Sequence, residues 1–303
     1  MLSERLTEVH WTWLIYTEMF LEGVAVGLII AAFFLALAGR GHAPTARTAH
    51  LLAFPVMLIV TLMLIVDLNR PERFWHMVIM NEQLRLMLKP WSPISLGTWL
   101  IIAFTGLTFI SFLDALIAGG RVRLGAWQKD RTVHGGPLGL IVTCLGAVTG
   151  LAVAIYAGVL LSVTNIPGWA HAPSIAAVYA ASAPVLGIAL LVLVQSIRGW
   201  IDADVLGLAQ TNIWLIAFWL AVTLVFLLTL GLSSEGGARY FLYGWPLLAI
   251  LGAIILGGII PLIMRIGAPL GRPRSLPISA ALVLLGGFLL RIGIVMGPQE
   301  WMH

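Results

Sequence analysis

The sequence predicts an all-α membrane protein with eight transmembrane helices. Three observations favour this class: 60% of the 303 residues are hydrophobic, only 10% are charged, and the mean hydropathy is +1.01. A water-soluble domain of this length cannot cover its surface with so few charged residues. A helix needs about 20 apolar residues to cross the roughly 30 Å hydrocarbon core of a bilayer.

Eight apolar runs account for most of the sequence, and we expect each to cross the bilayer as a helix. They lie at residues 13–38, 50–67, 94–117, 136–161, 173–195, 211–231, 245–264 and 277–296. Neither a basic region nor a small-residue cleavage site precedes the first run, so we expect it to be retained rather than removed as a signal peptide. We expect two four-helix bundles, over residues 1–165 and 166–303.

The distribution of charge predicts how the helices are oriented. Ten of the seventeen Lys and Arg residues fall in or beside the loops that follow the first, third, fifth and seventh runs. Because Lys and Arg are enriched in cytoplasmic loops, these loops are predicted to face the cytoplasm. Both termini are then expected on the outer, periplasmic side of a bacterial cytoplasmic (inner) membrane.

Cysteine and histidine limit the redox cofactors that we expect in this protein. The single Cys144 cannot hold an iron–sulfur cluster, which needs several thiolates. Haem b needs axial side chains, usually imidazoles, that project from helices. The histidines are predicted in loops or at helix ends, with no buried pair facing each other. They are His10, His42, His50, His76, His134, His171 and His303. We therefore expect no haem and no metal site, and electron transfer through a bound organic carrier.

Two acidic side chains lie inside the first run, where ionisable groups are costly. Glu18 and Glu22 are five and nine residues past Trp13, about 7 and 13 Å below the outer interface. They are four residues apart and share a helix face. Because two carboxylates this close repel each other, at least one is expected to be protonated or paired with a cation. Alternatively, both bond to neighbouring helices as neutral acids.

A second polar group follows the second run, in the segment DLNRPERFWH at 67–76. Pro71 turns the polypeptide out of the helix, and Asp67 is spaced to form an ion pair with Arg70. This level also receives the start of the third run and the end of the fourth, so four helices contribute to one candidate ligand pocket. Its predicted members are Glu18, Glu22, Asp67, Arg70, Trp91, Ser92, Trp99 and Tyr156, with His76 at the rim.

Other features have simpler explanations. Trp and Tyr near helix ends often form an aromatic belt, and basic side chains there often reach lipid head groups. The segment 72–88 is patterned as an amphipathic helix on the outer surface. The second half contains few ionisable groups: Arg291 lies about one turn inside the eighth run, and Asp202 and Asp204 are expected in a solvated loop.

Three segments resemble the membrane subunits of the NrfD/PsrC family, the polysulfide reductase membrane subunits. They are DLNRPERFWH at 67–76, LKPWSPISLGTWL at 88–100 and IYAGVLLS at 155–162. The predicted helix count, outward termini and lack of haem ligands agree with this family. The motif matches lie in the first four helices, whereas the agreement in topology covers the whole sequence.

The resemblance implies a quinone site in the first four-helix bundle, near the outer face, for menaquinone or ubiquinone. It also implies an iron–sulfur, ferredoxin-like subunit docked on that face and a separate catalytic subunit, so this protein is not expected to be catalytic alone. The family's tyrosine near the end of the fourth helix falls on Tyr156. Its polar position in the first helix, a histidine in some members, falls near Glu18, with Glu22 as a rival. Asp67 and Arg70 match the family's motif directly, as quinone contacts or as braces of the pocket.

Together these features predict a quinol-oxidising or quinone-reducing subunit of a respiratory complex. Glu18 or Glu22 is expected to take a proton from quinol held by Tyr156, and Asp67 and His76 to pass it outward. No polar path is visible from Asp114 to this pocket, so proton pumping is not predicted. One alternative is a small-solute or ion transporter, which requires helices broken at matching positions of two halves, whereas these runs are uninterrupted. The other is a purely structural membrane anchor.

Overall fold

Eight long apolar helices form the protein in the computed structural model. The structure describes residues 11–68, 70–80, 84–122, 133–232, 238–266 and 275–300. Within these ranges, eight helical segments of 23 to 30 residues are long and apolar enough to cross a membrane, as the sequence predicted. The protein is therefore a multi-pass membrane protein.

The first four spans begin at residues that favour helix starts. They are α1 (Trp13–Leu37), α2 (Pro44–Asp67), α3 (Pro93–Ala118) and α4 (Pro137–Ser162). Proline opens the last three, because the first turn of a helix does not need its missing N–H. The hydroxyl of Thr12 caps α1, and that of Ser92 caps α3. Short 3-10 helices, η2 (Pro71–Met77) and η4 (Val133–Gly135), lie in the connections.

The second half contains the other four spans. They are α6 (Ile175–Ile197), α7 (Ala203–Leu232), the seventh span (Gly244–Ile266) and α11 (Ser275–Glu300), with the short helices α5 (Pro167–Ala170) and α8 (Ala238–Phe241) in the connections. The seventh span is continuous but not regular. It passes from α9 (Gly244–Ile254) through a π-helical turn, η5 (Ile255–Ile259), into α10 (Ile260–Ile266).

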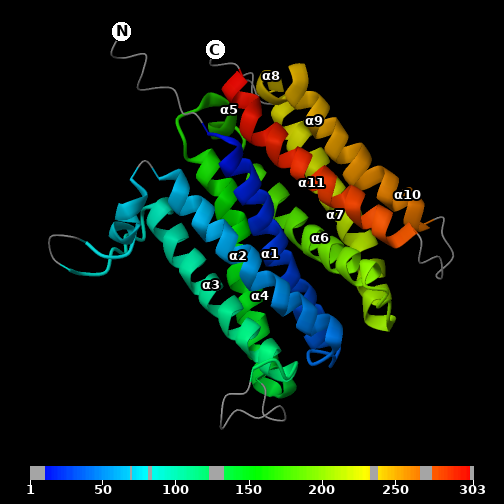
Figure 1. The fold of residues 1–303 in the computed structure, drawn as a ribbon. Helices are drawn as coiled ribbons and strands as arrows, with labels where there is room; N and C mark the ends of the chain where they lie inside the picture. The colour runs from blue at the N-terminus through cyan, green and yellow to red at the C-terminus, as the bar shows by residue number, and fades with distance from the viewer. Residues whose placement is uncertain are drawn as a thin grey trace.

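Helix α1 is central to the arrangement. It packs against α2, α4, α6 and α11, and α4 also packs against α6. In Figure 1 the helices α1 to α4 lie toward the left, α6 to α11 lie toward the right, and the start of α1 lies at the same end of the bundle as the end of α11. Where α1 crosses α6, Gly27 lies on the backbone of Gly187, and a Cβ atom at either glycine would overlap the other helix. The division into bundles at residue 165 remains a prediction.

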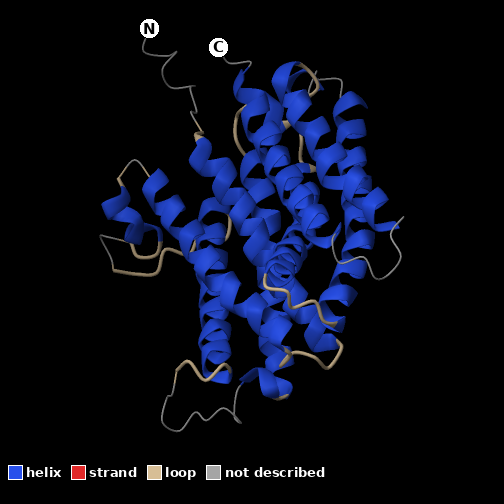
Figure 2. Ribbon diagram, turned by 45° about the vertical axis from the view of Figure 1, so that its right-hand side comes forward, coloured by secondary structure: helices blue, strands red, loops and turns tan. Residues whose placement is uncertain are grey.

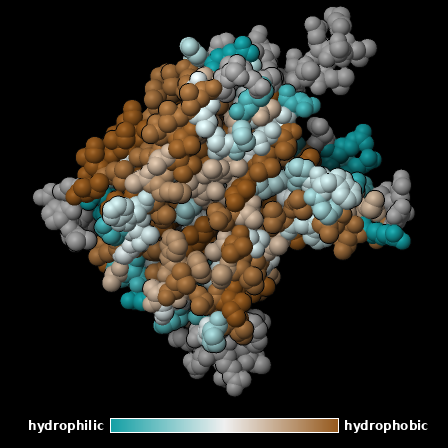
Figure 3. Space-filling model, turned by 180° about the vertical axis from the view of Figure 1, so that it is seen from behind, coloured by the Kyte–Doolittle hydropathy of each residue, from teal (hydrophilic) through white to brown (hydrophobic). Residues whose placement is uncertain are grey.

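The surface is apolar where a bilayer would surround the helices. Large hydrophobic side chains such as Trp214, Leu248 and Ile263 are 67% or more exposed on α7, α9 and α10. Figure 3 shows mainly hydrophobic residues over the face it presents, with hydrophilic residues gathered toward its margins. Among the described residues, helices make up most of the protein and loops connect them, as Figure 2 shows.

The segment after α2 differs from the sequence prediction. Residues 72–88 were expected to form one amphipathic helix, but the helix η2 ends at Met77. Beyond it, Ile79 pairs with Leu86 in an antiparallel bridge that is flanked by a backbone hydrogen bond of 2.7 Å from Met87 to Val78. The apolar residues at 78–80 and 86–88 instead pair as short antiparallel strands do. Hydrogen bonds between the two segments satisfy backbone groups that would have bonded to one another within a surface helix.

Candidate functional site

Two acidic side chains of α1 are buried inside the bundle. Glu18 and Glu22 each expose only 3% of their surface. They lie one helical turn apart, and their carboxyl groups interact with each other. The Oε1 atom of Glu18 is buried and has no hydrogen-bond partner among the described residues. Because an unpaired buried oxygen is costly, this atom is a candidate to bind a ligand or a proton.

Tyr156 of α4 lies within electrostatic range of the acidic pair. It interacts electrostatically with both Glu22 and Glu18. Its ring lies on Gly97 of α3, where a Cβ atom would overlap the ring carbons. Glycine at this position therefore leaves room for the tyrosine between α3 and α4. The sequence predicted Glu18, Glu22 and Tyr156 as site residues. It did not single out Gly97, although this glycine lies within the LKPWSPISLGTWL segment.

Arg291 of α11 completes the buried group, and sequence reasoning did not include it. The side chain is 1% exposed, and it interacts electrostatically with Glu22. Its Nη2 donates a hydrogen bond of 2.7 Å to the hydroxyl of Ser182 on α6, while Nε and Nη1 have no partner in the described part of the protein. The guanidinium carbon lies 4.6 Å from the ring centroid of Tyr179, also on α6. Because Arg291 is a charged residue inside an apolar run, its position in the sequence could have indicated a functional role.

Asp67 and Arg70 lie at the end of α2, where both side chains are exposed. Asp67 interacts electrostatically with Glu18. The ion pair expected between Asp67 and Arg70, two described residues, is not formed. The backbone leaves the helix at Leu68, which is extended (φ −66°, ψ 133°). The three-residue spacing therefore no longer places the two side chains on one helical face.

The tryptophans and the serine of the third span surround the start of α3 rather than the buried acids. Trp91 is 80% exposed. The Ser92 hydroxyl accepts a hydrogen bond of 3.4 Å from the backbone of Ser95, and the Trp99 indole N–H donates one of 3.0 Å to the carbonyl of Met87. These contacts brace the segment that leads into α3. Whether the three residues also contact a ligand remains a prediction.

His76 lies in η2, outside the helical bundle. Its ring centroid is 3.8 Å from that of Trp75, and its Nε2 atom is buried without a hydrogen-bond partner within the described ranges. Its role as an outer proton acceptor remains a prediction. His10 and His303 fall outside the described residues.

A buried pair of histidines lies at the opposite end of the bundle, where the sequence predicted none. His50 is 1% exposed, and its ring centroid is 4.2 Å from that of His134. The prediction failed because α2 begins at Pro44, six residues before His50, and because η4 returns His134 to the side of α2. His134 also contacts Asp114 of α3, with Nδ1 2.6 Å from Oδ2. The expectation that no two histidines face each other inside the protein is therefore wrong.

Comparison with known proteins agrees with the motifs and the fold. The family model described as "Polysulphide reductase, NrfD" matches residues 2–302. The protein is also similar to the C subunit of polysulfide reductase from Wolinella succinogenes, with 26% identity over 98% of this sequence and 97% of that protein. Because the family model covers almost the whole sequence, the protein belongs to the NrfD family of polysulphide reductase membrane proteins.

Proposed function

We propose that this protein is the quinone-reactive membrane subunit of a respiratory oxidoreductase in a bacterial inner membrane. The observation that carries the proposal is the group of buried Glu18, Glu22 and Arg291 beside the half-buried Tyr156, in which Glu18 and Arg291 have polar atoms without partners among the described residues. Membership of the NrfD family, and similarity to a subunit of a polysulfide reductase, support a place in a multi-subunit redox complex.

The buried group fits the head group of menaquinone or ubiquinone. The oxidised head group accepts hydrogen bonds at two carbonyl oxygens, and the reduced head group donates them from two hydroxyls. The Tyr156 hydroxyl is a donor for the first form, and the unpaired Oε1 of Glu18 is an acceptor for the second. When bound, quinol supplies two electrons and two protons. Ser182 and Tyr179 hold Arg291 in place beside the site.

The two glutamates differ in the charged side chains that act on them. Arg291 interacts with Glu22, whereas the charged neighbours that act on Glu18 are Glu22 and Asp67. We therefore assign Glu22 as the partner of the Arg291 cation and Glu18 as the proton acceptor. Asp67, exposed at the end of α2, then carries the proton toward the membrane surface, with His76 as the next candidate acceptor.

The end of the bundle that carries the termini is proposed to be the periplasmic end and to dock an iron–sulfur, ferredoxin-like subunit. Aromatic side chains are exposed there: Trp91 is 80% exposed, Phe74 46% and Trp75 38%. Exposed aromatic side chains in one segment are typical of protein interfaces. A partner on this surface would lie next to Asp67 and close to the buried group, and would pass electrons between the quinone and a catalytic subunit.

The test is quinol oxidation by the complex, purified through a tag on this subunit, with Glu18→Gln and Tyr156→Phe. Removing a general base is expected to slow turnover by about 100-fold or more, and Tyr156→Phe by about tenfold through the loss of one hydrogen bond. Matched controls are Glu72→Gln in η2 and Tyr16→Phe, whose ring packs edge-on against Phe288. Both controls should retain wild-type turnover.

Wild-type turnover in both Glu18→Gln and Tyr156→Phe would remove the quinone assignment. It would leave a structural anchor for the extrinsic subunits as the better explanation. Loss of the complex in both variants, checked by co-purification of the partner subunits, would also favour the anchor. Intact complex with slow turnover supports the proposal.

A further inference from the structure

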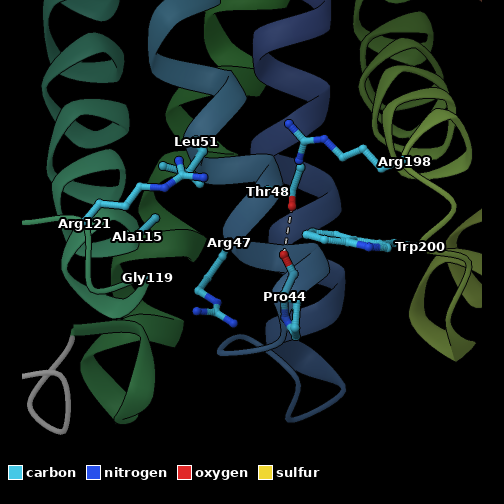
Figure 4. Close-up of a pocket in the computed structure, with 9 residues that line it drawn as sticks. All are labelled: Pro44, Arg47, Thr48, Leu51, Ala115, Gly119, Arg121, Arg198 and Trp200. Carbon is cyan, nitrogen blue, oxygen red and sulfur yellow. Dashed lines mark hydrogen bonds between the residues drawn. The ribbon is translucent and has the colours of Figure 1, made fainter.

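Two adjoining cavities lie at the end of the bundle opposite the termini, between α2, α3 and the end of α6. The first has a volume of about 260 Å³ and is lined by three arginines, Arg47, Arg121 and Arg198, together with Trp200. The three arginines come from three different segments of the sequence. Figure 4 shows Arg121 and Arg198 reaching toward α2 from opposite sides, with Arg47 below them.

The positive charge of this cavity is not balanced within the described residues. There, the ion pairs are Arg40 with Asp204 and His134 with Asp114. Arg47 donates one hydrogen bond of 3.3 Å to the carbonyl of Ala118, and its Nε is buried without a partner in the same ranges. Arg198 lies 6.0 Å from the ring centroid of Trp200.

The acidic residues nearest in the sequence are already engaged. Asp202 accepts hydrogen bonds from Thr45 and from the backbone of Val205, and Asp204 pairs with Arg40 at 3.0 Å. Three arginine side chains that line one cavity therefore favour an anion from outside the described residues. Guanidinium binds phosphate oxygens in a paired, planar geometry, which makes phosphate the best match.

The second cavity extends the first toward the middle of the bundle, and the residues that it adds to the lining are apolar. It has a volume of about 220 Å³ and shares Thr48, Leu51, Arg121 and Arg198 with the first. Its additional lining residues are Leu52, Phe112 and Leu116. Leu52 lies one helical turn deeper than Thr48, and Phe112 lies deeper in α3 than Gly119, which lines the first cavity. The lining of the paired cavities is thus charged at the helix ends and consists of apolar side chains further along the helices.

We propose that the paired cavities bind one anionic phospholipid. Its phosphate lies among Arg47, Arg121 and Arg198, and one acyl tail lies along Leu52, Phe112 and Leu116. Basic cavities between membrane helices are known to recognise anionic lipid head groups. This site is separate from the buried acidic group and does not depend on the proposed quinone chemistry.

The experiment measures lipid retained by the complex after purification in mild detergent and exchange into phosphatidylglycerol or phosphatidylcholine nanodiscs. Native mass spectrometry then counts the bound lipids. Wild type should retain phosphatidylglycerol in preference to phosphatidylcholine. Each of Arg121→Gln and Arg198→Gln should weaken retention by about fivefold, from the attraction of one basic residue for an anionic lipid. Arg265→Gln, at the same end but lining a different cavity, is the matched control and should not change it.

A second variant separates a lipid from free phosphate. Leu52→Trp fills the apolar cavity and should lower phosphatidylglycerol retention while leaving the three arginines intact. If the bound ligand is a lipid, inorganic phosphate should fail to displace it from the wild-type protein. Full displacement by millimolar phosphate, with no effect of Leu52→Trp, would show a free-anion site and overturn the lipid proposal. Equal retention of both lipids, or unchanged retention in both arginine variants, would also overturn it.

Discussion

Two buried polar groups, one near each end of the bundle, differ in how completely they are hydrogen-bonded. Asp114 accepts hydrogen bonds from the backbone N–H groups of Val133 and His134 and also contacts the His134 ring, so both of its oxygens have partners. Glu18, buried to a similar degree, leaves Oε1 without a partner among the described residues.

The difference is consistent with a structural role for Asp114 and with the binding role that we propose for Glu18. Asp114 ties η4 to the end of α3 and fixes the turn into α4, which a fully bonded carboxylate does well. Near Glu18 the atoms without partners in the described ranges belong to several helices: Oε1 of Glu18, the hydroxyl of Tyr179, and Nε and Nη1 of Arg291. Buried atoms left unpaired in this way cost stability unless something else bonds to them. Burial alone therefore does not distinguish the two carboxylates, whereas their hydrogen-bond partners do.

The largest effect is expected for Arg291→Met. It removes the hydrogen bond to Ser182 and the positive charge that acts on Glu22, and the free energy of unfolding should fall by about 1–3 kcal/mol. Turnover should fall about 100-fold or more, because a fixed positive charge near the reacting group is lost. Thermal melting in detergent and quinol turnover measure the two effects. The double variant Arg291→Met with Glu22→Gln should regain most of the stability; if it does not, the two side chains are not coupled.

Gly97→Ala should reduce turnover about tenfold, because a Cβ atom at this position overlaps the Tyr156 ring and moves its hydroxyl. The matched control is Gly106→Ala in the same helix, where a Cβ atom meets nothing within 4 Å. The control should have normal turnover and unchanged or higher melting temperature, since alanine favours the helix. Equal turnover in both variants would show that the position of Tyr156 does not matter.

Asp114→Asn probes the fully bonded group at the other end. Losing the charged acceptor for His134 and for two backbone N–H groups should lower the free energy of unfolding by about 1–3 kcal/mol. Turnover per intact complex should stay at the wild-type value, because Asp114 lies at the opposite end from the acidic pair. A large fall in turnover with unchanged melting temperature would mean that this group, too, has a catalytic role.

Ser92→Ala is expected to have the smallest effect. It removes the hydroxyl that caps α3, a change of about 1 kcal/mol, and should slow quinol turnover by less than about twofold. A strong fall in turnover at unchanged stability would return Ser92 to the binding site that the sequence predicted.

The eight spans and the polar residues of α1 and α4 were predictable from the sequence. Long apolar runs leave few alternatives to a transmembrane helix, and Glu18 and Glu22 are conspicuous within one. The predicted spans start within six residues of the observed helices except for the sixth, predicted at 211–231, because α7 begins at Ala203. Its first turns contain Asp204 and Gln210, and these polar residues concealed the start of the helix.

Contacts between distant segments were not predictable. Arg291 is 269 residues from Glu22, and no local pattern indicates that α11 packs beside α1. The same holds for Gly97, whose importance depends on the ring of Tyr156 on another helix, and for His50, which meets His134 only after η4 folds back. The paired cavities of Arg47, Arg121 and Arg198 likewise assemble from three segments, and each arginine alone has the pattern of an ordinary cytoplasmic loop residue.

Photo-crosslinking of the complex with an azido-quinone, followed by mapping of the labelled peptides by mass spectrometry, would locate the bound quinone directly. We expect label on the parts of α1, α4 and α6 that surround Glu18, Tyr156 and Tyr179, and loss of that label when excess unmodified quinol competes. Label confined to α7, α9 or α10, or label on α1 that excess quinol does not reduce, would contradict a quinone site at the buried acidic pair.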